Sequence, residues 1–161
     1  MENDFQTFLS LVGRLNYTWT NTESLLIHMI AGLAGVTKEV ATIIFLTLNT
    51  SRARIDLVER LVKMDNQAKD LKDEVLELTS SMSKTLKLKN KYNHCIYSFD
   101  CEGRNASTVL MRISDRKNEI EYGKTSPINN REISLVKETI SKTQNVNKAL
   151  WGFFQKHSYP V

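Results

Sequence analysis

The stretch LKLKNKYNHCIYSFD, residues 86–100, decides how the rest of the sequence is interpreted. Before it, apolar residues recur every three or four positions, which is the spacing of one face of a helix. After His94 the period becomes two, because polar and apolar side chains alternate as they do along a strand. The sequence therefore predicts a long helix that ends within this stretch and a β segment that begins there.

Helical stretches account for most of the chain. Apolar side chains recur at helical spacing in five segments, and the predicted helices cover residues 5–33, 37–48, 51–63, 71–92 and 130–157. Gly32 and Gly35 are expected to end the first of them, because glycine relaxes the backbone at a helix C-terminus. We therefore predict a mainly α protein, an up-and-down bundle of about five helices.

A small β insertion is predicted between the fourth and the last helix, at about residues 95–125. Three short runs have strand-like composition and are separated by turn residues; they cover residues 95–100, 108–114 and 119–123. These runs favour a small antiparallel meander. We interpret the whole chain, residues 1–161, as a single helical domain that carries this insertion.

The second predicted helix differs from the others because it lacks a polar face. Its body, residues 40–48, is apolar on almost every side. A short helix of this kind is buried on more than one side. It is therefore either the central helix of the core or covered by a second subunit, and we consider it the candidate contact of a homodimer.

Composition argues against several classes of protein. The longest apolar runs fall short of the ~20 residues that a membrane-spanning helix needs, and no basic start leads into an apolar core as in a secretory signal. Cys95 and Cys101 are too few for a disulfide framework and lack metal-ligand partners at useful spacing. We therefore expect a cytoplasmic protein with reduced thiols, without a membrane segment, a metal ion or a cofactor.

Positive charge is concentrated around the stretch described first. Residues 78–99 contain no acidic side chain, but they contain four lysines, Lys84, Lys87, Lys89 and Lys91. A local excess of cations attracts phosphate groups, so Lys84, Lys87 and Lys91 are candidate phosphate or RNA contacts. A solvated helix face is the alternative interpretation of the same pattern.

Lys89, Asn90 and His94 form the candidate catalytic group. Asn90 and His94 are four residues apart and share a helix face, and the long side chain of Lys89 can reach the same space. A cation offsets phosphate charge, an amide orients a substrate, and an imidazole moves protons near neutral pH. The combination suits a phosphodiester, although a helix-capping histidine would produce the same spacing.

The segment LKNKYNHCIYSFD, residues 88–100, resembles the signature of the HEPN superfamily of helical-bundle proteins. In that superfamily an Arg, commonly followed by Asn, precedes a His by five residues near the end of a helix. The order of elements is also similar: a long first helix, an apolar second helix and a motif late in the bundle. A β insertion followed by a closing helix resembles some uncharacterised bacterial members.

The resemblance implies a function. Members are commonly homodimers whose paired motifs form one cleft, and many are metal-independent ribonucleases of toxin–antitoxin, phage-defence or CRISPR-linked systems. By this resemblance His94 would be the acid/base that assists attack of the 2′-hydroxyl on the adjacent phosphate, and Asn90 would orient the substrate. Glu23, on the first helix, is a possible helper. The implied partners are RNA, a second copy of the chain and an antitoxin-like protein.

Lys89 departs from the family pattern. It stands where the family usually has Arg, and a lysine is a point charge that cannot form the planar bidentate contact of a guanidinium with phosphate. A catalytically degenerate dimer that binds RNA, a nucleotide or a protein partner without cleavage is therefore the alternative. In a third interpretation the dimer surface itself is the function, and polar substitutions at Ile43 or Phe45 would abolish it.

Overall fold

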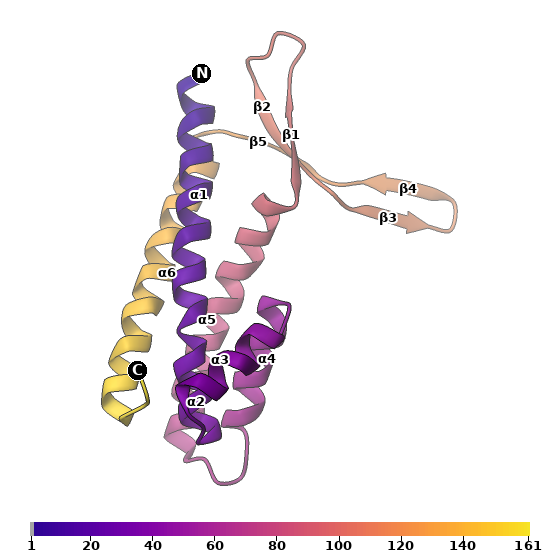
Figure 1. Cartoon of the computed structure of the whole chain (residues 1–161). Helices are drawn as coiled ribbons and strands as arrows, with labels where there is room; N and C mark the ends of the chain where they lie inside the picture. The colour runs from indigo at the N-terminus through magenta and orange to yellow at the C-terminus, as the bar shows by residue number, and fades with distance from the viewer. Residues whose placement is uncertain (1) are drawn as a thin grey trace. The chain divides into compact units, whose positions relative to one another are not determined.

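The computed structural model describes the backbone of residues 2–161 and the side chains of residues 5–161. Figure 1 shows that helices dominate this part of the chain, as predicted. The helices are α1 (Glu2–Ser24), α2 (Leu26–Ala34), α3 (Lys38–Thr47), α4 (Ser51–Val62), α5 (Lys69–Asn93) and α6 (Asn130–His157). The strands, between α5 and α6, are β1 (Cys95–Phe99), β2 (Ala106–Leu110), β3 (Ile113–Arg116), β4 (Glu119–Tyr122) and β5 (Thr125–Pro127). No helix among the described residues combines the length and apolarity needed to cross a membrane.

The single first helix that the sequence predicts is divided at Leu25. The N–H of Leu25 donates to the carbonyl of Thr22 at 3.2 Å, a bond across three residues that tightens the turn. The hydroxyl groups of Thr22 and Ser24 donate to carbonyls in the preceding turn, and such bonds bend helices. α2 then ends at Gly35, whose φ of 64° is left-handed, as expected of a glycine cap.

Gly32 has a different role from the predicted one. It lies inside α2, and a Cβ atom at this position would be 2.2 Å from the ring of Tyr159. A side chain there would collide with the ring. Gly32 therefore permits close packing of the C-terminal segment and does not end a helix.

Contacts group the residues into two units, each with its own apolar core. Unit 1 comprises Met1–Tyr17 and Lys87–Ile140, and unit 2 comprises Thr18–Leu86 and Ser141–Val161. The core of unit 1 consists of Phe8, Val12, Leu15, Tyr92, Ile133, Val136 and Ile140. The larger core of unit 2 includes Trp19, Leu26, Met29, Ile30, Ile55, Val58, Leu150, Phe153 and Phe154.

The β insertion has more strands than the predicted meander. β1, β2 and β5 form one antiparallel sheet, in which β2 is the middle strand, whereas β3 and β4 form a separate two-stranded ribbon. The predicted strand at residues 108–114 is divided, because the N–H of Arg112 donates to the carbonyl of Leu110 at 2.8 Å in a tight three-residue turn. Figure 1 shows the β3–β4 ribbon leaving the β1–β2 hairpin at this point. The prediction of three strands was therefore wrong in number.

α3 is only partly buried. Ala41 and Phe45 lie in the core of unit 2, whereas Ile43 and Leu46 are 62% and 66% exposed and Val40 is also exposed. The interpretation of this helix as the central core helix is therefore wrong. The three exposed side chains occur at steps of three residues along one face. Within the described chain this face is uncovered, and its role as a dimer contact stays a prediction.

Candidate functional site at the end of α5

His94 is the one residue between α5 and β1, at the place where the sequence predicts the change from helix to strand. Its N–H donates to the carbonyl of Asn90 at 3.0 Å, the bond of a last helical turn. Its own carbonyl accepts from the N–H of Met111 at 3.3 Å, which begins the pairing of β1 with β2. The backbone of His94 is therefore fixed from both sides.

The side chains of the candidate group are available to a ligand. His94 and Asn90 are exposed, and Lys89 is half-buried. Asn90 and His94 are joined by an i to i−4 backbone bond, so they share a helix face as predicted. Within residues 5–161 these three side chains have no hydrogen bond or ion pair with another part of the chain. A cation, an amide and an imidazole therefore lie within about one and a half turns, each without a competing partner.

Neighbouring residues of α5, in contrast, are tied to other elements. The amides of Asn93 and Asn16 of α1 exchange two hydrogen bonds, at 2.7 and 2.8 Å. The ring of Tyr92 packs edge-on against Phe8 with centroids 5.2 Å apart, and the hydroxyl of Tyr97 donates to the Tyr92 carbonyl at 3.1 Å. The end of α5 is thus held in unit 1 by the contacts of Tyr92 and Asn93, whereas the side chains of Asn90 and His94 are exposed and unbonded.

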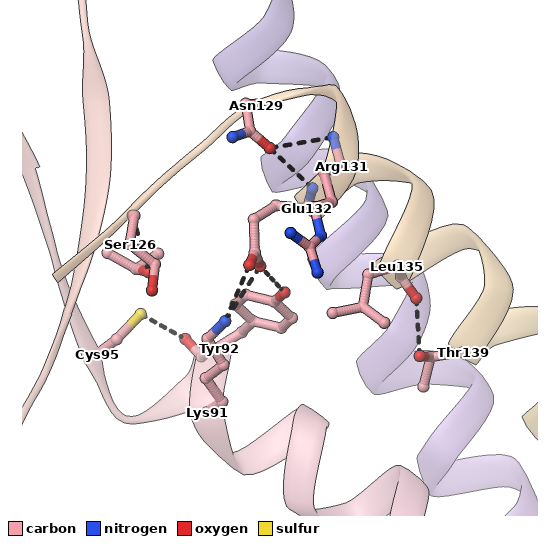
Figure 2. A network of polar contacts seen from close by, with 10 residues as sticks. Lys91, Tyr92, Cys95, Ser126, Asn129, Arg131, Glu132, Leu135 and Thr139 are labelled. Carbon is pink, nitrogen blue, oxygen red and sulfur yellow. Dashed lines mark hydrogen bonds and ion pairs between the residues drawn. The ribbon is translucent and has the colours of Figure 1, made fainter. Parts of the chain in front are cut away.

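Glu132 of α6 is the centre of a polar network that sequence reasoning missed (Figure 2). The ammonium of Lys91 donates to both of its carboxylate oxygens, at 3.1 and 3.2 Å, and the hydroxyl of Tyr92 donates to the same carboxylate. Burial, together with this hydrogen bond, raises the pKa of Tyr92 well above its usual range. Tyr92 therefore stays a neutral donor, and the charge of Lys91 is balanced within the chain.

The first turn of α6 positions this carboxylate. The side-chain oxygen of Asn129 accepts hydrogen bonds from the N–H groups of Arg131 and Glu132, at 3.0 and 3.1 Å (Figure 2). An asparagine cap satisfies free donors of a helix start, and a carboxylate is favourable in that first turn. The spacing Asn129-x-x-Glu132 resembles a capping box, which is the one signal in the sequence that could have drawn attention to Glu132.

The predicted phosphate contacts are not equivalent. Lys87 and Lys89 lie in unit 1 with His94 and have no acidic partner among the described residues, whereas Lys91 is bound by Glu132. Lys84 is exposed and belongs to unit 2. Of the four candidate lysines, Lys87 and Lys89 are therefore the two that lie in the same unit as His94 and have no acidic partner among the described residues.

Glu23, the possible helper, lies in unit 2 and is buried, with 6% of its surface exposed. Its carboxylate is 3.3 Å from the guanidinium of Arg54 in α4. Arg54 in turn donates to the carbonyl of Phe45 at 3.1 Å and stacks on the ring of Phe45, 4.1 Å from its centroid. One Glu23 oxygen has no well-aligned hydrogen bond. The partner that the structure gives this acid is therefore Arg54, and a role toward His94 stays a prediction.

Two observations bound the chemistry of the site. In the part of the chain that the structure describes, no group of three or more His, Cys, Asp or Glu side chains gathers as a metal site would require. Cys95 and Cys101 are free thiols, the first buried and the second exposed.

In comparisons with known proteins, no family model matches the chain, and neither the curated proteins nor the solved structures contain a match.

Proposed function

We propose that this chain is a HEPN-like, metal-independent ribonuclease, a toxin-like or defence domain that cleaves RNA through His94. The observation that carries the proposal is the exposed imidazole of His94 at the end of α5, beside Asn90 and Lys89, with none of the three side chains bonded elsewhere in residues 5–161. A general base has to be accessible to the proton that it removes. This group meets that condition.

The proposed reaction is an internal transesterification. The neutral imidazole of His94 removes the proton of a ribose 2′-hydroxyl, and the 2′-oxygen forms a bond with the adjacent phosphorus. The bond from phosphorus to the 5′-oxygen breaks, and the second His94 of a homodimer protonates the leaving oxygen. Lys89 offsets the charge that develops on the phosphate, and Asn90 orients it. The products are a 2′,3′-cyclic phosphate and a free 5′-hydroxyl.

A homodimer completes this proposal. The exposed face of α3, formed by Val40, Ile43 and Leu46 of unit 2, is the candidate surface for association, because exposed apolar faces mark sites of protein association. An antitoxin-like protein is the other candidate occupant of that face. The mass of the purified chain at micromolar concentration distinguishes the two, since a dimer requires no other protein.

Cleavage of labelled RNA by the purified protein in the presence of EDTA tests the ribonuclease. We expect cleavage by the native chain and a loss of at least about 10²-fold in His94→Ala, the lower range for general acid–base groups. His157→Ala is the matched control, because His157 is bonded to Glu74 in unit 2 and takes no part in the proposal. Equal cleavage by the native chain and His94→Ala, or none by the native chain, contradicts it.

Binding without cleavage is the second candidate. Two observations favour it: Lys91 is already neutralised by Glu132, and no carboxylate or carbonyl of the described chain orients the His94 imidazole. Catalytic histidines are commonly oriented by such a third group. This candidate predicts RNA binding that survives His94→Ala and weakens in Lys89→Ala. Lys91→Ala should weaken binding less than Lys89→Ala, because Lys91 has an internal partner.

A further inference from the structure

The β3–β4 ribbon has two different faces. Cross-strand partners in an antiparallel pair lie on the same side, and Ile113 pairs with Tyr122 while Asp115 pairs with Ile120. One face therefore carries three large side chains, of which Tyr122 is 80% exposed, Ile113 64% and Ile120 57%. The other face carries the remaining residues of the two strands, Ser114, Arg116, Glu119 and Glu121.

Two of the three acidic residues of the ribbon share one arginine, whereas three of its four cations have no acidic partner within the described chain. Arg116 contacts Glu119 at 3.5 Å and Glu121 at 3.0 Å, so one arginine engages two of the three acids. Arg112, Lys117 and Lys124 are exposed and form no ion pair within the described chain. Residues 111–124 carry four cations and three acids, a net charge of +1, and three of the cations are unpaired against one unpaired acid, Asp115. A surface of this kind attracts a polyanion.

The ribbon starts beside His94. Met111, which precedes β3, donates to the His94 carbonyl, and the N–H of Leu110 donates to the carbonyl of Lys124 at 3.3 Å. Because β2 lies between β1 and β5, His94 and Lys124 are separated by two strand spacings, about 10 Å. Gly123 permits this close crossing, since a Cβ atom there would overlap the carbonyl oxygen of Leu110.

We propose that the β3–β4 ribbon binds single-stranded nucleic acid and guides it to His94. A base stacks on the ring of Tyr122, and Arg112 and Lys124 contact phosphates at the end of the ribbon nearest His94. Proteins that bind single strands combine exposed aromatic rings with cations along the backbone, because every base offers a stacking face. The guiding role rests on the proposed function of His94, whereas the binding itself does not.

A second copy of the chain suits this surface less well. Three side chains on a ribbon of two four-residue strands bury far less than the roughly 1,200 Å² of a stable protein interface. Face-to-face pairing would also bring three unpaired cations of each copy together with only one unpaired acid, Asp115, from each. Neither objection applies to a strand of phosphates and bases.

Anisotropy of a fluorescent single strand of about twelve nucleotides, mixed with the full chain, tests the proposal. RNA and DNA of the same sequence are compared, because DNA lacks the 2′-hydroxyl and cannot be cleaved by the proposed reaction. We expect Tyr122→Ala to weaken binding of both roughly five- to one-hundredfold, and Tyr122→Phe to retain it. Arg112→Gln and Lys124→Gln should each reduce the slope of log K against log salt by about 0.7.

Matched controls lie outside the ribbon. Tyr17 is an exposed tyrosine of α1, and Lys148 is an exposed lysine of α6, so Tyr17→Ala and Lys148→Gln should bind as the native chain does. Native-like binding by Tyr122→Ala, or no binding of either strand by the native chain, overturns the proposal. The proposal is also overturned if the chain binds phosphatidylserine vesicles in a manner that depends on Tyr122 but does not bind the oligonucleotides. Tyr122-dependent DNA binding without RNA cleavage sustains the ribbon and defeats only the ribonuclease.

Discussion

Tyr92 and Glu132 join the last turn of α5 to the first turn of α6 through a hydrogen bond from the phenol to the carboxylate. The two residues are 40 positions apart in the sequence. Lys91 completes the contact, and the ring of Tyr92 is buried in the core of unit 1. The turn that carries His94 thus lies two residues from this buried junction.

This junction predicts a measurable stability difference. Glu132→Ala leaves the buried hydroxyl of Tyr92 without its acceptor, which costs about 1–3 kcal/mol of unfolding free energy. Tyr92→Phe, as a separate variant, removes the hydroxyl itself and should cost less unfolding free energy than Glu132→Ala, because no buried hydroxyl is left unpaired. Urea unfolding measures both, with Glu77→Gln, an exposed acid of α5, as the control. A Glu132→Ala variant as stable as the native chain would show that the hydrogen bond is not what stabilises the junction.

Substitutions at a buried and at an exposed residue of α3 should have different effects on stability and association. Phe45 is buried, so Phe45→Ala should cost about 3–5 kcal/mol of stability, whatever the state of association. Ile43 is exposed, so Ile43→Lys should change the stability of a monomer by less than about 0.5 kcal/mol and should dissociate a dimer formed by α3.

Sedimentation equilibrium at micromolar concentration and urea unfolding separate these effects. A native chain that sediments as a monomer contradicts the proposed dimer. If the native chain is a dimer and Ile43→Lys remains one, the interface does not involve α3. Phe45, which the sequence offered as an equivalent probe of the surface, is unsuitable because its loss damages the core.

Glu74 predicts a loss of stability in acid. Its hydrogen bond from Lys156, supported by a second contact with His157, holds the pKa of this carboxyl below its usual value of 4.5. A lowered folded-state pKa contributes stability above the unfolded-state pKa, and that contribution is lost as the pH falls through the folded-state value. The side chain is one-third exposed, so the contribution is below about 1 kcal/mol.

Urea unfolding between about pH 3 and pH 6 measures this contribution. The native chain should exceed Glu74→Gln in stability above about pH 4.5, and the difference should shrink as the pH falls below that value. A constant difference across the range would assign the effect to packing. Glu77→Gln again serves as the control, because Glu77 has no partner within the described chain.

Two glycines in helices of unit 2 predict opposite signs for the same substitution. Gly32→Ala places a methyl group against the ring of Tyr159 and should cost about 1–3 kcal/mol. Gly152→Ala has no neighbour within 4 Å and should stabilise α6 by roughly 0.5–1 kcal/mol, because alanine loses less backbone entropy in a helix. Thermal or urea unfolding compares them. A stable Gly32→Ala would show that the Tyr159 ring yields easily.

Local chemistry was readable in the sequence. The side chains of Thr37 and Thr50 cap α3 and α4, Gly35 caps α2, and the change of period places His94 between α5 and β1. Each of these features depends on residues within about one helical turn. Their spacing is therefore written directly in the sequence.

Features that join distant residues required the tertiary structure. The partner of Lys91 is 41 positions away, and the position of Glu23 beside Arg54 depends on how two helices pack. The exposure of Ile43 and the division of a strand at Met111–Arg112 also depend on what lies alongside them. The sequence thus determined most of the helices, the caps at Gly35, Thr37 and Thr50, and the place of His94, because these follow from local spacing, whereas it missed the division of the first helix at Leu25. Only the tertiary structure decided which cations remain unpaired around it, since that depends on carboxylates brought together by folding.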